Sequence, residues 1–222
     1  MADARYFDIR HVKGTVTHVD MDNARVESAG TVFLDRAILR VLGPRGWGIL
    51  EIDHYTRPRG TLFEELVEKA AGLASLTGQE VHLADVPAGS IAVPPLKENP
   101  AEVDLQEKQQ LLAEIERSAR IEGIKSTRAN YIERFEEVHF EDSSGNESSF
   151  AISRSGFSIL AVAERGGDMQ MGYVRRHVLQ DFNLRHRQEE GREAAARAIA
   201  LLDARTPRGG TMNAVLDPEL AG

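Results

Sequence analysis

The regular segments of this chain come in blocks, and the order of the blocks constrains the fold more than any single motif. Strand-like apolar runs fill residues 5–53, and a second strand-like block fills residues 124–178. Between them, residues 84–100 contain four prolines, which cannot continue a helix because proline lacks the backbone N–H and restricts the preceding residue. Blocks that do not alternate strictly indicate an α+β fold with a mainly antiparallel sheet. We therefore predict two antiparallel β-meanders packed with about three helices.

Turn residues and apolar alternation divide the two blocks into strands. Tyr6–Arg10 alternates apolar and polar side chains, as a half-buried strand does. Gly43–Gly46 predicts a tight turn between two strands, and Asp142–Asn146 predicts a hairpin turn. Ser153–Gly156 is interpreted as a further turn between strands. Phe157–Ala163 is apolar on both faces, which predicts a central strand covered on both sides.

Three segments have the apolar spacing of amphipathic helices. Thr61–Gly78 opens with the T-x-x-E pattern of a capping box and closes with glycine. The second predicted helix runs over Asp104–Gly123, and the third over about Glu189–Leu202. After a Pro/Gly loop, the short apolar run Ala214–Leu216 predicts the beginning of another strand.

These elements suggest a division of the chain into three parts. Residues 1–83 form a β-meander-plus-helix subdomain, residues 84–100 a Pro-rich crossing segment, and residues 101–222 a helix, the second meander and the last helix. The composition, 41% hydrophobic and 28% charged over 222 residues, is that of a globular protein with a buried core. The chain has no cysteine and no apolar run near the roughly 18 residues of a membrane span. No secretory leader opens it, so we expect a cytoplasmic protein without membrane contact.

The histidines do not predict a metal site. Two histidines on one helical face bind zinc when they are four residues apart, and no such pair lies on a predicted helix. The seven histidines are His11, His18, His54, His82, His139, His177 and His186. We interpret them as solvated or structurally satisfied side chains and nominate no metal ligand.

The sequence also nominates no catalytic residue and no phosphate loop. Ser153–Gly156 lacks the strand-to-helix setting of a nucleophile elbow. Gly43–Gly48 is glycine-rich but joins two predicted strands, whereas a phosphate cradle leads into a helix. The basic clusters Arg175–His177 and Arg185–Arg187 are interpreted as a solvated face or as half of a salt-bridged interface. The net charge of −8 disfavours direct nucleic-acid binding.

One binding mode does suit a β-rich chain. An extended peptide can add to the edge of a sheet, because backbone hydrogen bonds then supply affinity without requiring a particular sequence. The two meanders provide candidate edges, which the fold itself or a dimer interface can also cover. The residues that would contact a peptide stay unknown at this point.

Several segments, in order along the chain, resemble the TldD/PmbA family, also called modulators of DNA gyrase or peptidase family U62. The resembling segments are Tyr6–Arg10 (D-x-R), Arg40–Gly48 (R-V-L…G-x-W-G), Ile124–Tyr131 (I-x-S-x-x-x-Y), Ser143–Gly145 (S-x-G), Leu201–Gly209 (L-L-D-A…P-x-G) and Val215–Gly222 (V-L-D-P-x-L-A-G). The ending is closer to TldD than to PmbA. The helix that usually precedes the first strand in the family is missing.

The resemblance implies a zinc-dependent peptidase that cleaves unfolded or short peptides and works as a homodimer or as a TldD–PmbA heterodimer. In the family, an H-E-x-x-x-H helix in the carboxy-terminal half holds the zinc, and this motif does not occur here. We therefore expect an amino-terminal half that walls the cleft and supports the dimer, is inactive alone, and depends on zinc bound elsewhere. The alternatives are a stand-alone module that binds peptides or a partner without hydrolysis, and a truncation product. Whether Gly222 is the native end stays open.

Overall fold

The computed structural model describes residues 4–58, 61–78, 81–84, 92–205, 208–211 and 213–221. Its centre is a six-stranded sheet in the order β3-β2-β1-β4-β5-β6, and every neighbouring pair is antiparallel. The strands are β1 (Tyr6–Asp22), β2 (Arg25–Gly43), β3 (Gly46–Asp53), β4 (Ile124–Asp142), β5 (Glu147–Arg165) and β6 (Asp168–Leu179). The predicted α+β architecture with two antiparallel meanders is confirmed.

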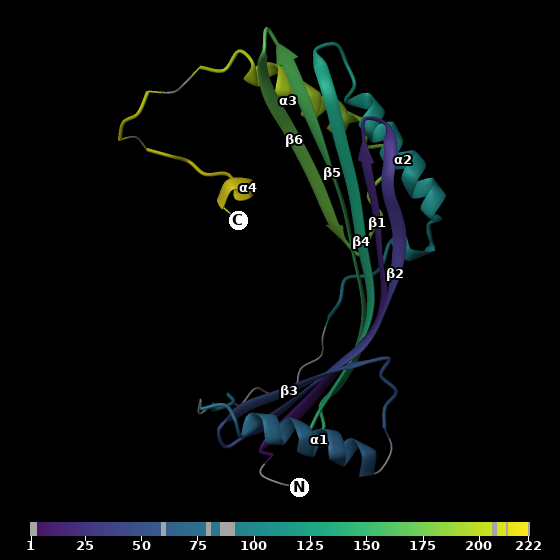
Figure 1. Ribbon diagram of the computed structural model, residues 1–222, viewed down its shortest axis with the longest axis vertical. Helices are drawn as coiled ribbons and strands as arrows, with labels where there is room; N and C mark the ends of the chain where they lie inside the picture. Colours follow the sequence, from purple (N-terminus) through teal and green to yellow (C-terminus); the bar gives the residue numbers. More distant parts are fainter. Residues whose placement is uncertain are drawn as a thin grey trace.

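The two meanders join into one sheet through their first strands. β1 pairs with β4 along nearly its whole length, from Asp8 opposite Asp142 to Asp22 opposite Arg128. The strands come very close at Gly14, where an added Cβ would lie 1.9 Å from the carbonyl oxygen of Phe135. Glycine at this position permits that close backbone approach. Figure 1 shows the long strands running from one end of the sheet to the other through a pronounced bend.

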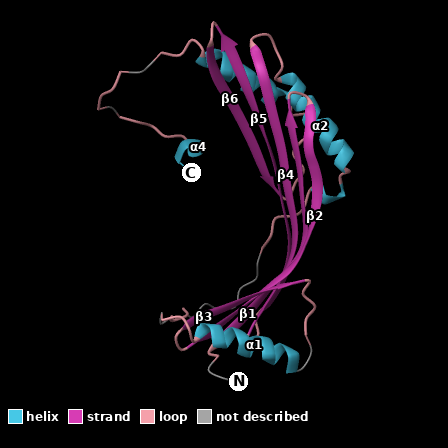
Figure 2. Cartoon of the chain, in the orientation of Figure 1, coloured by secondary structure: helices cyan, strands magenta, loops and turns pink. Residues whose placement is uncertain are grey.

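Three longer helices cover the sheet, and two short ones lie elsewhere (Figure 2). They are α1 (Thr61–Ala74), η1 (Pro100–Glu102), α2 (Leu105–Ser118), α3 (Gln188–Leu201) and α4 (Pro218–Ala221). The predicted cap of the second helix is present, because the Asp104 side chain accepts a 2.7 Å hydrogen bond from the backbone N–H of Gln106. No helix in the described part of the chain is long and apolar enough to cross a membrane.

The helices at both ends of the sheet pack on the same face. Ile9 of β1 belongs to the core beneath α1, whereas Val19 and Met21 of the same strand belong to the core beneath α2 and α3. All three positions are odd-numbered, and alternate residues of a strand share a face. Figure 1 agrees, because α1 and α2 both lie on the outer side of the bend. The inner face is therefore the one that α1, α2 and α3 leave open.

Some sequence expectations are wrong in detail. Ser153–Gly156 is not a turn but lies within β5, whose alternation continues through it. Phe157–Ala163 is a central strand segment, but only its odd-numbered residues are buried, since no helix of the described residues covers the inner face. Ala214–Leu216 forms no strand, and the described residues after it enter the short helix α4. Asp217 offers a local reason, because its side chain accepts a hydrogen bond from the Leu220 N–H as an N-cap does.

The Pro-rich crossing segment lies partly outside the described residues, which omit 85–91. Its described part, residues 92–99, forms neither helix nor strand, as the prolines predict. The proposed division at residues 84–100 stays a prediction. The same sheet nevertheless continues across it through the β1–β4 pairing.

Candidate functional site on the open face of the sheet

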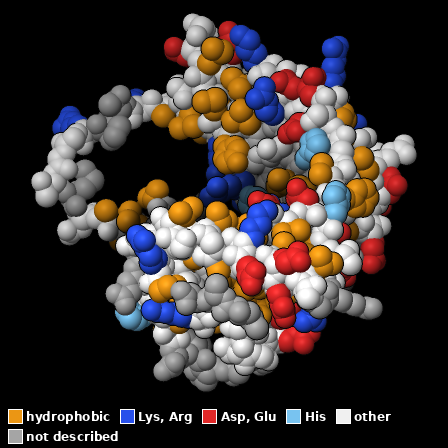
Figure 3. Space-filling model, turned by 60° about the horizontal axis from the view of Figure 1, so that its bottom comes forward, with side chains coloured by type: hydrophobic (Ala, Val, Ile, Leu, Met, Phe, Trp, Pro, Cys, Tyr) orange, Lys and Arg blue, Asp and Glu red, His pale blue; other side chains and the backbone are white. Residues whose placement is uncertain are grey.

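The inner face of the sheet carries an unusual number of exposed apolar side chains. Even-numbered residues of β4 and β5 point to this face, and they pair with odd-numbered residues of β6. The exposed apolar residues here are Val32, Ile132, Met169, Met171, Tyr173 and Leu179. Figure 3 shows a hollow in the molecule with apolar side chains around it and basic side chains within it. A concentration of exposed apolar surface is typical of a face that contacts another molecule.

A groove with two arginines lies on this open face, and we call it the arginine groove. Its lining includes Ile132, Arg134, Arg154, His177 and Leu179, and its volume is about 410 Å³. Arg134 and Arg154 are direct partners in the β4–β5 register. The ring of His177 lies across Gly156, where an added Cβ would be 2.0 Å from Nδ1. Glycine thus allows the imidazole to lie against the floor of the groove.

One carboxylate serves both guanidinium groups of the arginine groove. Arg134 Nη2 forms an ion pair with Glu136 Oε1 at 2.9 Å, and Arg154 Nη1 donates a hydrogen bond to Glu136 Oε2 over 3.3 Å. The Glu136 side chain is buried, whereas both arginines are partly exposed. Two like charges placed directly opposite each other on neighbouring strands repel, and a single carboxylate compensates only one of them. The groove therefore has a local excess of positive charge in a protein whose net charge is −8.

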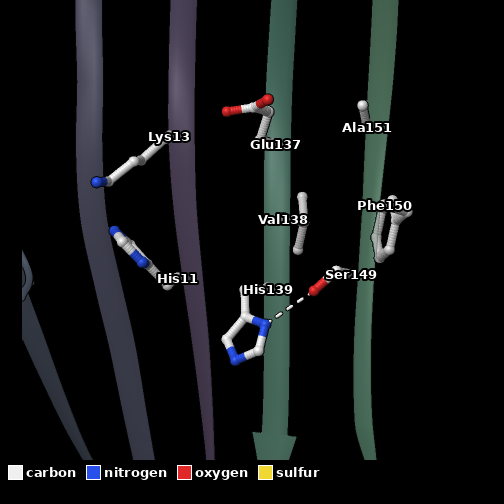
Figure 4. Close-up of a pocket in the computed structure, with 8 residues that line it drawn as sticks. All are labelled: His11, Lys13, Glu137, Val138, His139, Ser149, Phe150 and Ala151. Carbon is white, nitrogen blue, oxygen red and sulfur yellow. Dashed lines mark hydrogen bonds between the residues drawn. The ribbon is translucent and has the colours of Figure 1, made fainter. Parts of the chain in front are cut away.

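A second groove, the histidine groove, lies on the opposite face of the sheet, and Figure 4 shows its lining residues. It is lined by His11, Lys13, Glu137, Val138, His139, Ser149, Phe150 and Ala151, with a volume of about 360 Å³. His11 bonds Asp35 through Nε2 over 2.8 Å and meets the Tyr55 ring edge to face. This hydrogen bond is the main reason that the pKa of Asp35 is lowered from its ordinary value.

Ser149 and His139 in the histidine groove superficially suggest a catalytic pair. His139 Nδ1 and Ser149 Oγ are 2.9 Å apart, as Figure 4 shows by a dashed line. A third group must orient the histidine for nucleophilic catalysis. The nearest carboxylates, on Glu141 and Glu147, are 3.8 and 3.7 Å from His139 Nε2, beyond normal hydrogen-bond length. We interpret the pair as a cross-strand contact.

Residues from two of the family-like segments meet at the α1 end of the sheet. Arg40 forms a two-pronged pair with the buried Asp8, with distances of 2.8 and 2.7 Å. The Arg40 guanidinium also lies over the Trp47 ring, which meets the Tyr6 ring edge to face. Burial, followed by the negative charge of Asp8, raises the pKa of Tyr6 to about 12. The D-x-R and R-V-L…W segments thus build a structural cluster that joins β1, β2 and β3.

The two basic clusters form salt bridges within the chain. Arg176 contacts Glu193 of α3 over 2.9 Å, and Arg187 contacts Glu190 over 3.1 Å. Arg185 bonds Glu98 and Glu107, and these hydrogen bonds raise its pKa above the ordinary value. These three arginines are therefore paired with carboxylates of the same chain and do not form an unpaired basic patch.

The described residues do not fit the zinc that the family resemblance implies. Among them, no group of three or more histidine, aspartate or glutamate side chains is placed to hold a metal ion. His11 and His139 are cross-strand neighbours in the β1–β4 register, and His177 lies on the other face of the sheet. We therefore assign no metal chemistry to these residues.

Sequence reasoning did not find the arginine groove. Arg134 and Arg154 are 20 positions apart and become neighbours only through the β4–β5 register. The pairing of the two arginines could in part have been predicted, because the predicted hairpin turn at Asp142–Asn146 fixes which residues of the two strands face each other. The mistaken turn at Ser153–Gly156 hid it by ending the strand too early.

Sequence comparison connects the chain with metallopeptidases. Residues 98–202 match the family described as the PmbA/TldA metallopeptidase central domain. A metalloprotease of Methanocaldococcus jannaschii is 28% identical over 227 residues, covering 98% of this chain and 49% of the relative. A metalloprotease of Methanothermobacter thermautotrophicus is 26% identical, with 98% and 48% covered. The chain thus spans about half the length of the curated relatives it matches.

Solved structures show the same fold. A candidate modulator of DNA gyrase from Thermotoga maritima superposes with a TM-score of 0.77 at 14% identity, covering 92% of this chain and 46% of that one. TldE from Thermococcus kodakarensis gives a TM-score of 0.61 at 14% identity, covering 90% and 44%. These identities support the fold alone, whereas the sequence matches above concern the family. The chain is accordingly similar to TldD/PmbA proteins, and its residues 98–202 match the PmbA/TldA metallopeptidase central domain.

Proposed function

We propose that this chain is the cleft-wall and dimer-supporting part of a TldD-like zinc metallopeptidase that acts on unfolded or short peptides. The hydrolytic zinc site would lie in a part of such an enzyme other than the residues described above. The chain's contribution would be to hold the substrate and to support a homodimer or a heterodimer of the TldD–PmbA kind. A cytoplasmic location would suit this role.

The observation that carries the proposal is the bent sheet with one face covered by helices and the other open. The open face combines exposed apolar side chains, such as Ile132 and Met171, with the polar arginine groove. Unfolded peptides offer both apolar side chains and backbone polar groups, so a mixed surface of this kind suits them. The sheet also ends in the strands β3 and β6, each paired on one side only, and such edges can accept an added strand.

The test is to incubate the purified full chain with a short unstructured peptide, with and without added zinc. Fluorescence anisotropy reports binding, and mass spectrometry reports whether the peptide stays intact. The proposal expects saturable binding without cleavage in either condition. Zinc-dependent cleavage by the chain alone, or the lack of any peptide binding, would contradict it.

The alternative is a stand-alone module that binds peptides or a partner chain and has no hydrolytic role. This alternative is favoured by the size of the two cores, because their 17 and seven buried apolar side chains among the described residues can stabilise a chain that folds on its own. Adding the remaining half of a relative such as the Methanocaldococcus jannaschii metalloprotease separates the two ideas. Peptide cleavage by the mixture supports the cleft-wall role. A mixture in which no peptide is cleaved and the two chains do not associate supports the module.

A further inference from the structure

We propose that the arginine groove binds the free carboxylate of an extended peptide at its carboxy-terminal end. This inference deepens the proposed function and rests on it for the identity of the ligand. The groove would make the open face selective for peptides with a free carboxyl terminus, and it would fix the direction in which a peptide lies on the sheet.

The charges in the groove favour an anionic ligand. Arg134 and Arg154 face each other across β4 and β5, and the buried Glu136 compensates only one of the two positive charges. Arg134 Nε is buried and has no hydrogen-bond partner among the described residues. A buried donor without a partner is costly and is satisfied when an acceptor arrives. A singly charged anion would supply both the missing charge and an acceptor.

The geometry around the two arginines suits a carboxylate with an apolar side chain beside it. Guanidinium groups bind carboxylates through paired hydrogen bonds, and such bonds are about twice as strong as neutral ones. Ile132 and Leu179 lie beside the arginines in the groove, and both are about half exposed. They would pack against an apolar last side chain of the peptide. His177 lines the same groove and offers a further polar contact.

The charge of Glu136 favours a carboxylate over a phosphate. Glu136 forms ion pairs with both arginines and would repel the second charge of a phosphate. A carboxylate has one charge and a planar pair of oxygens, which matches the single uncompensated positive charge. The overall charge of −8 further disfavours a doubly charged ligand.

The experiment compares a leucine-terminated peptide with its carboxy-terminal amide on the full chain, by fluorescence anisotropy. The free acid should bind about tenfold more tightly, the effect of one charge-assisted hydrogen bond. Arg154→Gln should remove this preference by lowering the affinity for the free acid to that for the amide. Glu136→Gln should strengthen binding of the free acid, because it releases both guanidinium groups.

The matched control is Arg165→Gln, which removes an exposed arginine paired with Asp203 on the other face of the sheet. This variant should keep the full preference for the free acid. Circular dichroism confirms that each variant is folded. Equal affinity of the unmodified chain for acid and amide would overturn the inference while leaving peptide binding in place.

A second probe keeps the inference testable if no peptide binds. N-acetyl-leucine, N-acetyl-leucine amide and inorganic phosphate are titrated while NMR follows the Nε–H signal of Arg134. A shift with N-acetyl-leucine alone supports the carboxylate site even if the proposed peptide role fails. A shift with phosphate of equal or greater affinity, or no shift with any probe, would overturn the carboxylate assignment.

Discussion

The two ends of the sheet have the same arrangement of strands and helix, but their hydrophobic cores differ in size. At each end a three-stranded meander is followed by a helix that packs back on the third strand: α1 on β3 and α3 on β6. Each contact depends on a glycine, Gly48 in β3 and Gly172 in β6. Among the described residues, however, the core at the α1 end contains seven buried apolar side chains and the core at the α2–α3 end contains 17.

The unequal cores indicate where this fold is stabilised. The α2–α3 end adds a second helix, α2, and a buried polar network beneath it. Lys108 of α2 donates to Glu133 over 2.7 Å, and the Tyr131 hydroxyl donates to the same carboxylate over 2.6 Å. Burial is the main reason that the pKa of Tyr131 is raised above its ordinary value. We infer that the larger core at the α2–α3 end provides most of the stability of the sheet. The α1 end would be stabilised by it through the strands β1 and β4.

The largest effect is expected from breaking the buried ion pair. Lys108→Met removes the charge opposite Glu133, and an uncompensated buried charge costs about 3–5 kcal/mol of unfolding free energy. Urea unfolding followed by circular dichroism measures the loss. Lys69→Met on the exposed side of α1 is the matched control and should change the free energy by less than about 0.5 kcal/mol. The double change Lys108→Met, Glu133→Leu should recover most of the loss, and a double variant as unstable as the single one would contradict the account.

The next effect concerns the glycines that the two ends share. An added Cβ would lie 1.8 Å from the Ala70 carbonyl oxygen at Gly48, and 2.0 Å from the Ala194 carbonyl oxygen at Gly172. Because helix and strand must separate, Gly48→Ala and Gly172→Ala should each cost about 1–3 kcal/mol in urea unfolding.

Gly72→Ala in α1 is the control for the glycine substitutions, since nothing lies within 4 Å of its added Cβ. It should stabilise the protein by about 0.5–1 kcal/mol, because alanine is the better helix former. If Gly48→Ala or Gly172→Ala behaved like this control, the shared packing arrangement would be disproved at that end.

The sequence predicted those features of the fold that depend on residues close together in the chain. Alternation at Tyr6–Arg10, the turn at Gly43–Gly46 and the cap at Asp104 each depend on neighbours in the chain, and the structure confirms them. The β1–β4 pairing brings together residues more than a hundred positions apart, as in Gly14 opposite Glu136, and no local pattern specifies it. The arginine groove was missed for the same reason, because its two arginines meet only through strand register.

A smaller effect separates the two ends by pH. The hydrogen bond from His11 lowers the pKa of Asp35 at the α1 end. A carboxylate with a lowered pKa in the folded state adds stability above its unfolded pKa, and this stability is lost as pH falls through the folded value. Asp35→Asn should therefore reduce stability at neutral pH and flatten its decline below about pH 4. Thermal unfolding across an acid pH series measures this, and an unchanged pH profile would show that the His11–Asp35 contact has no energetic role.

The smallest effect is expected at the exposed pair of Arg165 and Asp203, which are 2.7 Å apart at the α2–α3 end. Both side chains are more than half exposed, so solvent screens their attraction. A double-mutant cycle with Arg165→Gln and Asp203→Asn should give a coupling of about 0.2–1 kcal/mol. A coupling well above this range would mean that surface pairs contribute to the difference between the ends.

Native-state hydrogen exchange can show whether the larger core, at the α2–α3 end, stabilises the whole continuous sheet. The account predicts the slowest exchange in the amides of Tyr131 and Ile159, which lie beneath α2 and α3. It predicts earlier exchange at Leu39 in β2 and at Val67 in α1, by partial opening of the smaller end. Equal protection at both ends, or slower exchange at the α1 end, would contradict the claim.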